Sequence, residues 1–239
     1  MRILVTNDDS ISSKGLHELI KLAKGYGEVL VVAPKEEQSA KSHSIDIKNG
    51  LSLEEVDLGL DVKAYSLSST PADCVRAAYY ALNYDFDIVF SGINNGLNLG
   101  DDILYSGTVA AIFEAARIGK KGIAFSSNTN NHLEVVKNFE NIMNLFFQND
   151  LLSLNLIYNV NVPNEPIGIK FTKQGNTHFN TKFAKENDLY YQRGNPVFEK
   201  DLDNLDSDVC AIFNHYISIT PLVIDRTNYQ VLEILKKKE

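Results

Sequence analysis

The sequence begins MRILVTNDDS (residues 1–10), and this stretch decides the fold. Residues 3–5 form a short apolar run that ends in polar residues, which is typical of a buried strand in a parallel sheet. Apolar side chains between residues 16 and 23 then recur at helical spacing, and a second apolar strand follows at 29–33. A strand, a helix and another strand in this order predict the first unit of a parallel sheet.

Strand and helix patterns keep alternating as far as residue 125. Thr70 suits a helix N-cap and Pro71 suits the first helical position. Strands separated by helices predict an α/β fold with a mostly parallel, doubly wound sheet. The strands expected in this part are 62–67, 88–90 and 123–125, and a third helix covers about 108–117.

The C-terminal half is more mixed, and we expect it to complete the same sheet. In the N-terminal half, by contrast, alternating residues at 44–56, with Asn49-Gly50 between them, predict a β-hairpin. The polar stretch 176–187 is expected to form a loop or a projecting arm. No linker or repeat interrupts the chain, so a single domain over 1–239 is predicted, with a core at about 1–130. The later elements expected are a helix that begins at His132, strands at 156–162, 167–171 and 217–220, and a helix at 229–238.

Composition narrows the possible functions. A net charge of -8 and a pI near 5.2 argue against a surface that binds a nucleic-acid polymer. The two cysteines, Cys74 and Cys210, have no metal-site spacing and no disulfide framework. The first residues lack a signal-peptide pattern, and no apolar run is long enough to span a membrane. We therefore expect a cytoplasmic protein that does not bind membranes.

Polar residues follow three of the predicted strands and should meet at one edge of the sheet. Asp8 and Asp9 follow the first strand, residues 36–42 follow the second, and residues 91–102 follow the strand at 88–90. Two adjacent carboxylates fit either a turn with a helix cap or a site for Mg²⁺ or Mn²⁺. Their position at the end of the first strand favours the metal site. Ser39 alone looks like an ordinary loop residue, and its role depends on whether its loop lies beside Asp8.

The segment 91–102 is rich in glycine and asparagine. Its three glycines permit positive φ and close approach to a ligand, and its three asparagines offer neutral polar partners. Ser106, Gly107 and Thr108 then open a helix, whose free N–H groups favour a phosphate. A long turn with a serine cap is the alternative. Neither a Walker loop, a GxGxxG motif, a GxSxG elbow nor a histidine zinc spacing is present.

Taken together, these motifs resemble the SurE family. They lie in order along nearly the whole chain: Asn7-Asp8-Asp9, Ser39, Thr70-Pro71 with Asp73-Cys74, Ser91 to Asn94, Asn98 to Gly100, Tyr105 to Val109, Asn159 to Pro163, Thr172 to Gly175 and Ile217 to Leu222.

The resemblance implies a Rossmann-like three-layer α/β/α fold and a 5′/3′-nucleotidase acting on nucleoside monophosphates, with polyphosphatase activity in some relatives. It implies one divalent cation per subunit, Mg²⁺ or Mn²⁺, held by Asp8, Asp9, Ser39 and Asn94. It also implies homodimers or homotetramers that exchange C-terminal elements, which assigns oligomerisation to residues 131–239.

Two residues and one longer segment depart from the family pattern. Ser10 and Ala40 stand where the family often has glycine, and the arm at 179–195 differs from the usual version rich in glycine, proline and aromatic residues. The arm bears on substrate preference and assembly more than on the metal site.

The resulting hypothesis is metal-assisted hydrolysis of a phosphate monoester. Asp8, Asp9 and Asn94 are the predicted catalytic residues, with either aspartate orienting the attacking water or receiving its proton. The predicted substrate-binding residues are Asn95, Asn98, Ser106, Gly107 and Thr108.

The alternative is a non-catalytic, Mg²⁺-dependent phosphate or nucleotide sensor, because response-regulator receivers also carry paired acids after a first strand. A receiver is about half this length. It also needs an acceptor aspartate where this chain has Ser91.

Overall fold

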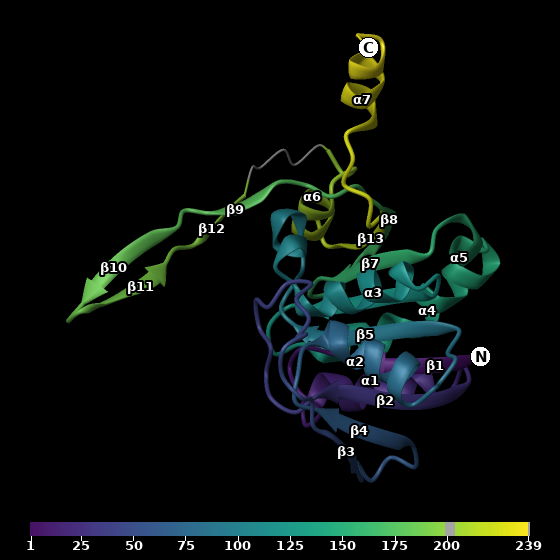
Figure 1. Cartoon of the computed structure of the whole chain (residues 1–239). Helices are drawn as coiled ribbons and strands as arrows, with labels where there is room; N and C mark the ends of the chain where they lie inside the picture. The colour runs from purple at the N-terminus through teal and green to yellow at the C-terminus, as the bar shows by residue number, and fades with distance from the viewer. Residues whose placement is uncertain (199–203, 239) are drawn as a thin grey trace.

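A nine-stranded sheet forms the centre of the molecule, and helices cover both of its faces (Figure 1). The computed structural model describes residues 1–198 and 204–238. The strand order is β3-β4-β2-β1-β5-β6-β7-β13-β8. The strands are β1 (Arg2–Thr6), β2 (Glu28–Pro34), β3 (Leu53–Val56), β4 (Lys63–Leu67), β5 (Ile88–Asn95), β6 (Lys121–Ser127), β7 (Ile157–Val162), β8 (Gly168–Phe171) and β13 (Tyr216–Leu222).

Strands β4, β2, β1, β5, β6 and β7 run parallel, whereas β3 and β13 pair antiparallel with β4 and β7. The chain builds outward from β1 through β2 to β4, and then from β5 through β6 to β7 on the other side. The boundary between β1 and β5 is therefore the topological switch point, where ligands of open α/β sheets bind. The mostly parallel, doubly wound sheet predicted from the sequence is confirmed.

Two apolar cores lie on opposite faces of the sheet. On one face, α1 and α4 pack against β1, β5, β6 and β7 through side chains such as Leu19, Phe90 and Phe139. On the other face, α2 and α3 pack through residues such as Val75 and Ile112. The helices are α1 (Lys14–Ala23), α2 (Pro71–Arg76), the π-helical η1 (Ala77–Ala81), the 3₁₀-helical η2 (Gly100–Leu104), α3 (Gly107–Arg117), α4 (His132–Gln148), α5 (Leu151–Leu154), α6 (Asp208–Phe213) and α7 (Tyr229–Lys236).

Local sequence signals explain the start of α2 and α3. Thr70 caps α2 by accepting a hydrogen bond from the Asp73 amide, and Pro71 occupies the first helical position as predicted. Ser106 caps α3 in the same way, so this helix begins one residue before the predicted start. Helix α4 begins at His132, where the sequence predicts the start of a helix. Within the described residues, no helix combines the length and the apolar character needed to cross a bilayer.

The predicted hairpin at 44–56 is wrong in its position. The hairpin that forms instead pairs β3 with β4, so its turn lies between residues 56 and 63. Asn49-Gly50 does not join two strands, because the Asp46 carboxylate accepts hydrogen bonds from the amides of Lys48 and Asn49. These bonds fold the chain into a local side-chain turn, which competes with strand pairing.

The predicted arm is present as a pair of two-stranded ribbons that project from the body (Figure 1). Helix α7 also stands away from the sheet. The predicted oligomerisation half, 131–239, includes residues 199–203 and 239, which lie outside the described residues. The prediction of a single domain stays a prediction. The ribbons are β9 (Thr177–Phe179) with β12 (Pro196–Phe198), and β10 (Lys182–Glu186) with β11 (Leu189–Arg193).

Candidate active site

A cavity of about 910 Å³ opens at the carboxyl ends of β1, β2 and β5, where the sheet reverses its order. All three loops predicted to meet at this edge contribute to its wall. Among the residues predicted from the sequence, the following line it: Asp8, Asp9, Ser39, Asn94, Asn95, Asn98 and Ser106. Gly107 and Thr108 lie directly behind this wall, against Asp8.

Asp8 is the most buried carboxylate of the cavity, with 6% of its surface exposed. The Thr108 hydroxyl donates a short hydrogen bond to Asp8 Oδ1. The pKa of Asp8 is raised to about 6, because burial and the nearby Asp9 carboxylate together outweigh the hydrogen bonds from Thr108, which lower it. None of the ion pairs formed within residues 1–198 and 204–238 includes Asp8. A bound cation would supply the missing positive charge.

Asp9 is held from the other side of the switch point. The Asn95 amide N–H donates to Asp9 Oδ2 at 3.1 Å, which links the loop after β1 to the end of β5. Partial burial raises the pKa of Asp9, and the nearby Glu37 carboxylate adds to this effect. The side chain of Asn95 is also engaged, because its Oδ1 accepts a hydrogen bond from the Asn130 amide at 2.7 Å.

The loop that carries Ser39 lies beside Asp8, which answers the question left open by the sequence. The Gln38 amide donates to the Asp8 carbonyl oxygen at 2.8 Å. Ser39 is exposed, and its hydroxyl donates to Glu37 at 2.5 Å. The side-chain amide of Asn94 donates to the Gly96 carbonyl at 2.7 Å, which engages Nδ2 and leaves Oδ1 available as a ligand.

Two residues beside the site have left-handed backbones although they are not glycine. Ser10 has φ of 92° and Ala40 has φ of 56°. These are the two positions at which the SurE pattern often has glycine. A left-handed conformation costs a non-glycine residue about 1 kcal/mol, so the loops after β1 and β2 carry local strain next to the cavity.

The N-terminus of α3 abuts Asp8 because Gly107 has no side chain. A Cβ at this position would lie 2.8 Å from the Asp8 Cβ and 2.9 Å from Asp8 Oδ2. Ser106 lies on the cavity wall while its Oγ caps the helix by accepting from the Val109 amide at 3.0 Å. The free N–H groups and the dipole of this helix end favour an anion such as phosphate.

Asn98 makes structural contacts that the sequence did not reveal. Its side-chain amide donates to Ser126 Oγ at 2.8 Å, and its backbone carbonyl oxygen accepts hydrogen bonds from the side-chain amides of Asn159 and Asn161. Its backbone amide donates to Asn161 Oδ1 at 2.8 Å. The predicted substrate-binding residue Asn98 therefore also fixes the loop to β6 and β7 through a buried amide network.

The wall of the cavity is strongly acidic. Among the described residues that line it, five carry carboxylates and none is Lys or Arg. A phosphate dianion would be repelled from such a wall unless a cation were bound. No group of three or more His, Cys, Asp or Glu side chains suited to a metal is found within the described residues, so a metal site here must include neutral oxygen donors. The carboxylates belong to Asp8, Asp9, Glu37, Asp101 and Asp102.

Several lining residues were not singled out from the sequence. Asp101 and Asp102 are the last two residues of the glycine- and asparagine-rich segment 91–102, and they lie in the first turn of η2. Thr181 and Gln192 reach the cavity from the arm, far along the chain from the other lining residues. The adjacent charges of Asp101 and Asp102 could have indicated their role, because they belong to a segment that was predicted to lie at the site. No sequence signal connects the arm to the site.

The mostly parallel sheet and the acidic cavity at its switch point place this protein in a class of α/β proteins, those that bind a ligand beyond the carboxyl ends of their strands. The chain belongs to the SurE family: the family model described as "Survival protein SurE" matches residues 3–181. The family membership and the Rossmann-like fold expected from the resemblance are both confirmed.

Relatives and a solved structure extend this similarity to the whole chain. A protein named 5′-nucleotidase SurE from Clostridium botulinum (strain ATCC 19397 / Type A) is 41% identical, over 98% of this chain and 97% of that protein. Its counterpart from strain Alaska E43 / Type E3 is 40% identical over 99% of both. The crystal structure of the SurE protein from Aquifex aeolicus superposes with a TM-score of 0.82 at 33% identity, covering 99% of both chains.

Proposed function

We propose that this protein is a metal-dependent phosphomonoesterase that releases phosphate from nucleoside 5′- and 3′-monophosphates, with short polyphosphate as a further substrate. The observation that carries the proposal is the meeting of Asp8, Asp9, Ser39 and Asn94 around one cavity, beside the N-terminus of α3. The relatives at about 40% identity named 5′-nucleotidase support the same activity. One Mg²⁺ or Mn²⁺ per subunit is part of the proposal.

The four side chains fit a hard cation. Two carboxylates and two neutral oxygens are the donor types that Mg²⁺ and Mn²⁺ prefer. Such a cation would polarise a phosphoryl oxygen and offset charge that develops in the transition state. Thr108 and the Asn95 amide hold Asp8 and Asp9 in place. In the proposed reaction the N-terminus of α3, with Asn94 and Asn95, holds the phosphoryl oxygens, and Asp8 or Asp9 orients the attacking water.

A substrate panel tests the proposal. We expect phosphate release from AMP and GMP, and from their 3′ isomers, in Mn²⁺ or Mg²⁺, with tripolyphosphate assayed alongside. EDTA should remove this turnover because the acidic wall then repels the substrate, and added Mn²⁺ should restore it. Turnover that persists in EDTA would contradict the metal-dependent reaction. Binding of nucleotides without turnover of any phosphoester would instead favour the sensor.

Direct attack by water is distinguished from a covalent aspartyl phosphate by one turnover in ¹⁸O-labelled water. We expect the label in the released phosphate and none in the protein. Label found in Asp8 or Asp9 would show that one of these carboxylates attacks phosphorus.

We further propose a homodimer or homotetramer that exchanges C-terminal elements and works in the cytoplasm. The buried free thiols of Cys74 and Cys210 are consistent with a reducing compartment. Helix α7 has no buried residues, and it exposes the apolar side chains of Val231, Ile234 and Leu235. The arm likewise exposes apolar side chains, including those of Phe183, Leu189 and Tyr190. Uncovered apolar surface of this kind marks a contact between chains.

Light scattering on the whole chain tests the assembly. We expect an oligomer whose mass falls when Ile234→Glu places a charge on the apolar face of α7. Gln230→Glu is the matched control because it adds the same charge at an exposed polar position of the same helix. A monomeric parent protein, or equal masses for the two variants, would rule out α7 as a contact.

A further inference from the structure

The segment 35–52, which carries Ser39, contains neither helix nor strand. Irregular segments of this length are uncommon in compact domains unless they serve a function. Backbone bonds to the end of β4 hold only the two ends of this segment, at Lys35 and Ser52, so other contacts must determine where Ser39 lies. Gln38 provides one such contact through the Asp8 carbonyl, on the N-terminal side of Ser39.

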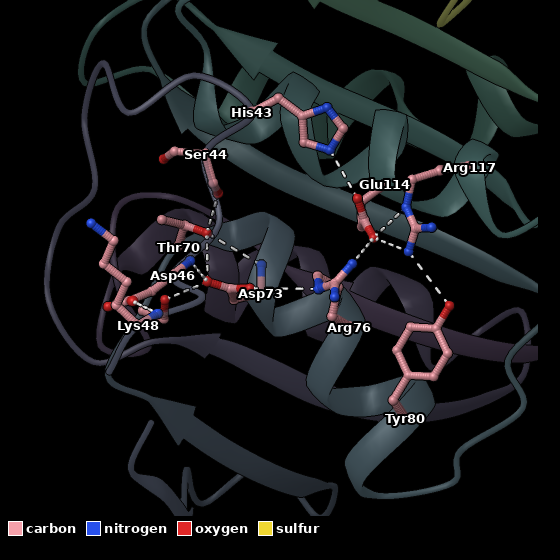
Figure 2. Close-up of polar contacts among 11 residues, drawn as sticks. His43, Ser44, Asp46, Lys48, Thr70, Asp73, Arg76, Tyr80, Glu114 and Arg117 are labelled. Carbon is pink, nitrogen blue, oxygen red and sulfur yellow. Dashed lines mark hydrogen bonds and ion pairs between the residues drawn. The ribbon is translucent and has the colours of Figure 1, made fainter. Parts of the chain in front are cut away.

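On the C-terminal side of Ser39, four residues between 42 and 46 bind the segment to α2 and its N-cap, to the C-cap of η2 and to α3. Ser42 donates from its amide to the Tyr105 carbonyl at 3.0 Å. The Ser44 carbonyl accepts from the Thr70 hydroxyl at 2.7 Å, and the Asp46 amide donates to Asp73 Oδ2 at 2.8 Å. Figure 2 shows these last two contacts, and beside them the contact of His43 with Glu114.

Glu114 is a buried carboxylate with 2% of its surface exposed, and it lies outside the candidate active site. Its Oε2 is 3.0 Å from His43 Nε2, and its Oε1 accepts from Arg76 at 3.2 Å and from Arg117 Nε at 2.8 Å (Figure 2). Arg76 also lies 3.7 Å from Asp73, so one guanidinium joins the two carboxylates that hold the segment.

Glu114 and Thr108 belong to the same helix, α3. Thr108 binds Asp8 at the first turn of this helix, and Glu114 binds His43 farther along it. A single rigid element therefore fixes the separation between Asp8 and the segment that carries Ser39. If Glu114 served only to neutralise Arg76 and Arg117, it would not need the contact with His43 as well.

We propose that Glu114 and Asp73 are positioning residues that hold the Ser39 segment in place relative to Asp8, through His43 and the Asp46 amide. The inference rests on the proposed function, because it gives these contacts the task of assembling the metal ligands. It also assigns a role to Thr70 and Asp73, whose motif the proposed reaction does not use.

His43→Ala is the decisive variant because it cuts the link to the segment and leaves Glu114 with both arginines. Arg117→Ala is the matched control, since it also removes one partner of Glu114 but does not touch the segment. We expect His43→Ala to weaken Mn²⁺ binding about tenfold, the lower end of the range for residues that orient metal ligands. Arg117→Ala should bind Mn²⁺ as the parent does.

Hydrogen exchange of the EDTA-treated protein provides a readout without metal or activity. The amides of residues 38–46 should exchange faster in His43→Ala than in Arg117→Ala, because only the former frees the segment. His43→Gln keeps a side-chain N–H donor and is expected to restore both exchange and Mn²⁺ binding. At saturating Mn²⁺, kcat of His43→Ala should approach that of the parent.

Equal exchange and equal Mn²⁺ affinity in His43→Ala and Arg117→Ala would overturn the inference, as would a folded His43→Gln that restores neither. These measurements remain decisive if the proposed function fails. A parent protein that binds Mn²⁺ without hydrolysing phosphomonoesters would refute the enzyme but not the positioning role. If the parent binds no Mn²⁺, the exchange comparison alone decides it.

Discussion

Replacing Asp8 with Asn is expected to remove most of the activity and, at the same time, to stabilise the metal-free protein. Asn cannot supply the charge that the proposed cation needs, so we expect kcat/KM to fall about 10²–10³-fold, as when an electrostatic contact to a transition state is lost. In EDTA the parent must keep a buried carboxylate ionised beside Asp9. The pKa of Asp8 is about 6 in the folded protein and has an ordinary value of 3.8. This difference means that ionised Asp8 destabilises the metal-free folded protein by about 3 kcal/mol above pH 6.

The sign of the pH dependence follows from the raised pKa of Asp8. Above pH 6 the cost of ionising Asp8 in the folded protein is fully present. As the pH falls from 6 toward 4, the folded protein takes up a proton before the unfolded chain does, and the cost disappears. The stability gained by Asp8→Asn should therefore shrink over this range.

Urea unfolding in EDTA at several pH values measures this gain, with the exposed Asp188→Asn as the matched control. An Asp8→Asn protein no more stable than the parent at pH 7.5 would contradict the argument. Added Mn²⁺ should reverse the order of stability, because it binds and stabilises only the parent.

The fold was predictable wherever a local pattern coincided with a buried strand. Residues 3–5 are all apolar because β1 is covered on both faces of the sheet. Since β1 runs parallel to β2 and β5, the loops that follow these strands, including Asp8 and Asp9, lie at the same edge of the sheet. Only the start of helix α4, at His132, was predicted, although the rest of the helix also carries a visible helical pattern. Its buried positions include Val135, Phe139, Ile142, Met143 and Phe146.

The site was predictable as a set of residues but not as a set of contacts. Asp8, Asp9, Ser39 and Asn94 were expected to lie together, and they line one cavity. Their supports were not expected, because those contacts join residues far apart in the chain. His43 binds Glu114 across 71 positions, and Asn98 binds Asn161 across 63. Such pairings depend on how α3 and β7 pack on the sheet, which no local pattern records.

Replacing Glu114 with Gln is expected to destabilise the protein, in contrast to the change at Asp8. Gln has nearly the same shape but cannot neutralise Arg76 and Arg117. Loss of one partner from a buried ion pair typically costs 3–5 kcal/mol, and partial exposure of the two guanidiniums reduces our expectation to about 2–3 kcal/mol. Glu233→Gln, in an exposed pair with Lys236, should change stability by less than about 0.5 kcal/mol.

The pH dependence of Glu114 has the opposite sign to that of Asp8. Burial raises its pKa, but hydrogen bonds from His43, Arg117 and Arg76 outweigh this and lower the pKa to about 2. A lowered pKa stabilises the folded state above the ordinary value of 4.5, and this contribution is lost as the pH falls from 4.5 toward 2. The stability gap between parent and Glu114→Gln should therefore close in acid. A gap of the same size at pH 7 and pH 3, measured by urea unfolding, would show that the effect comes from packing and not from the charge of Glu114.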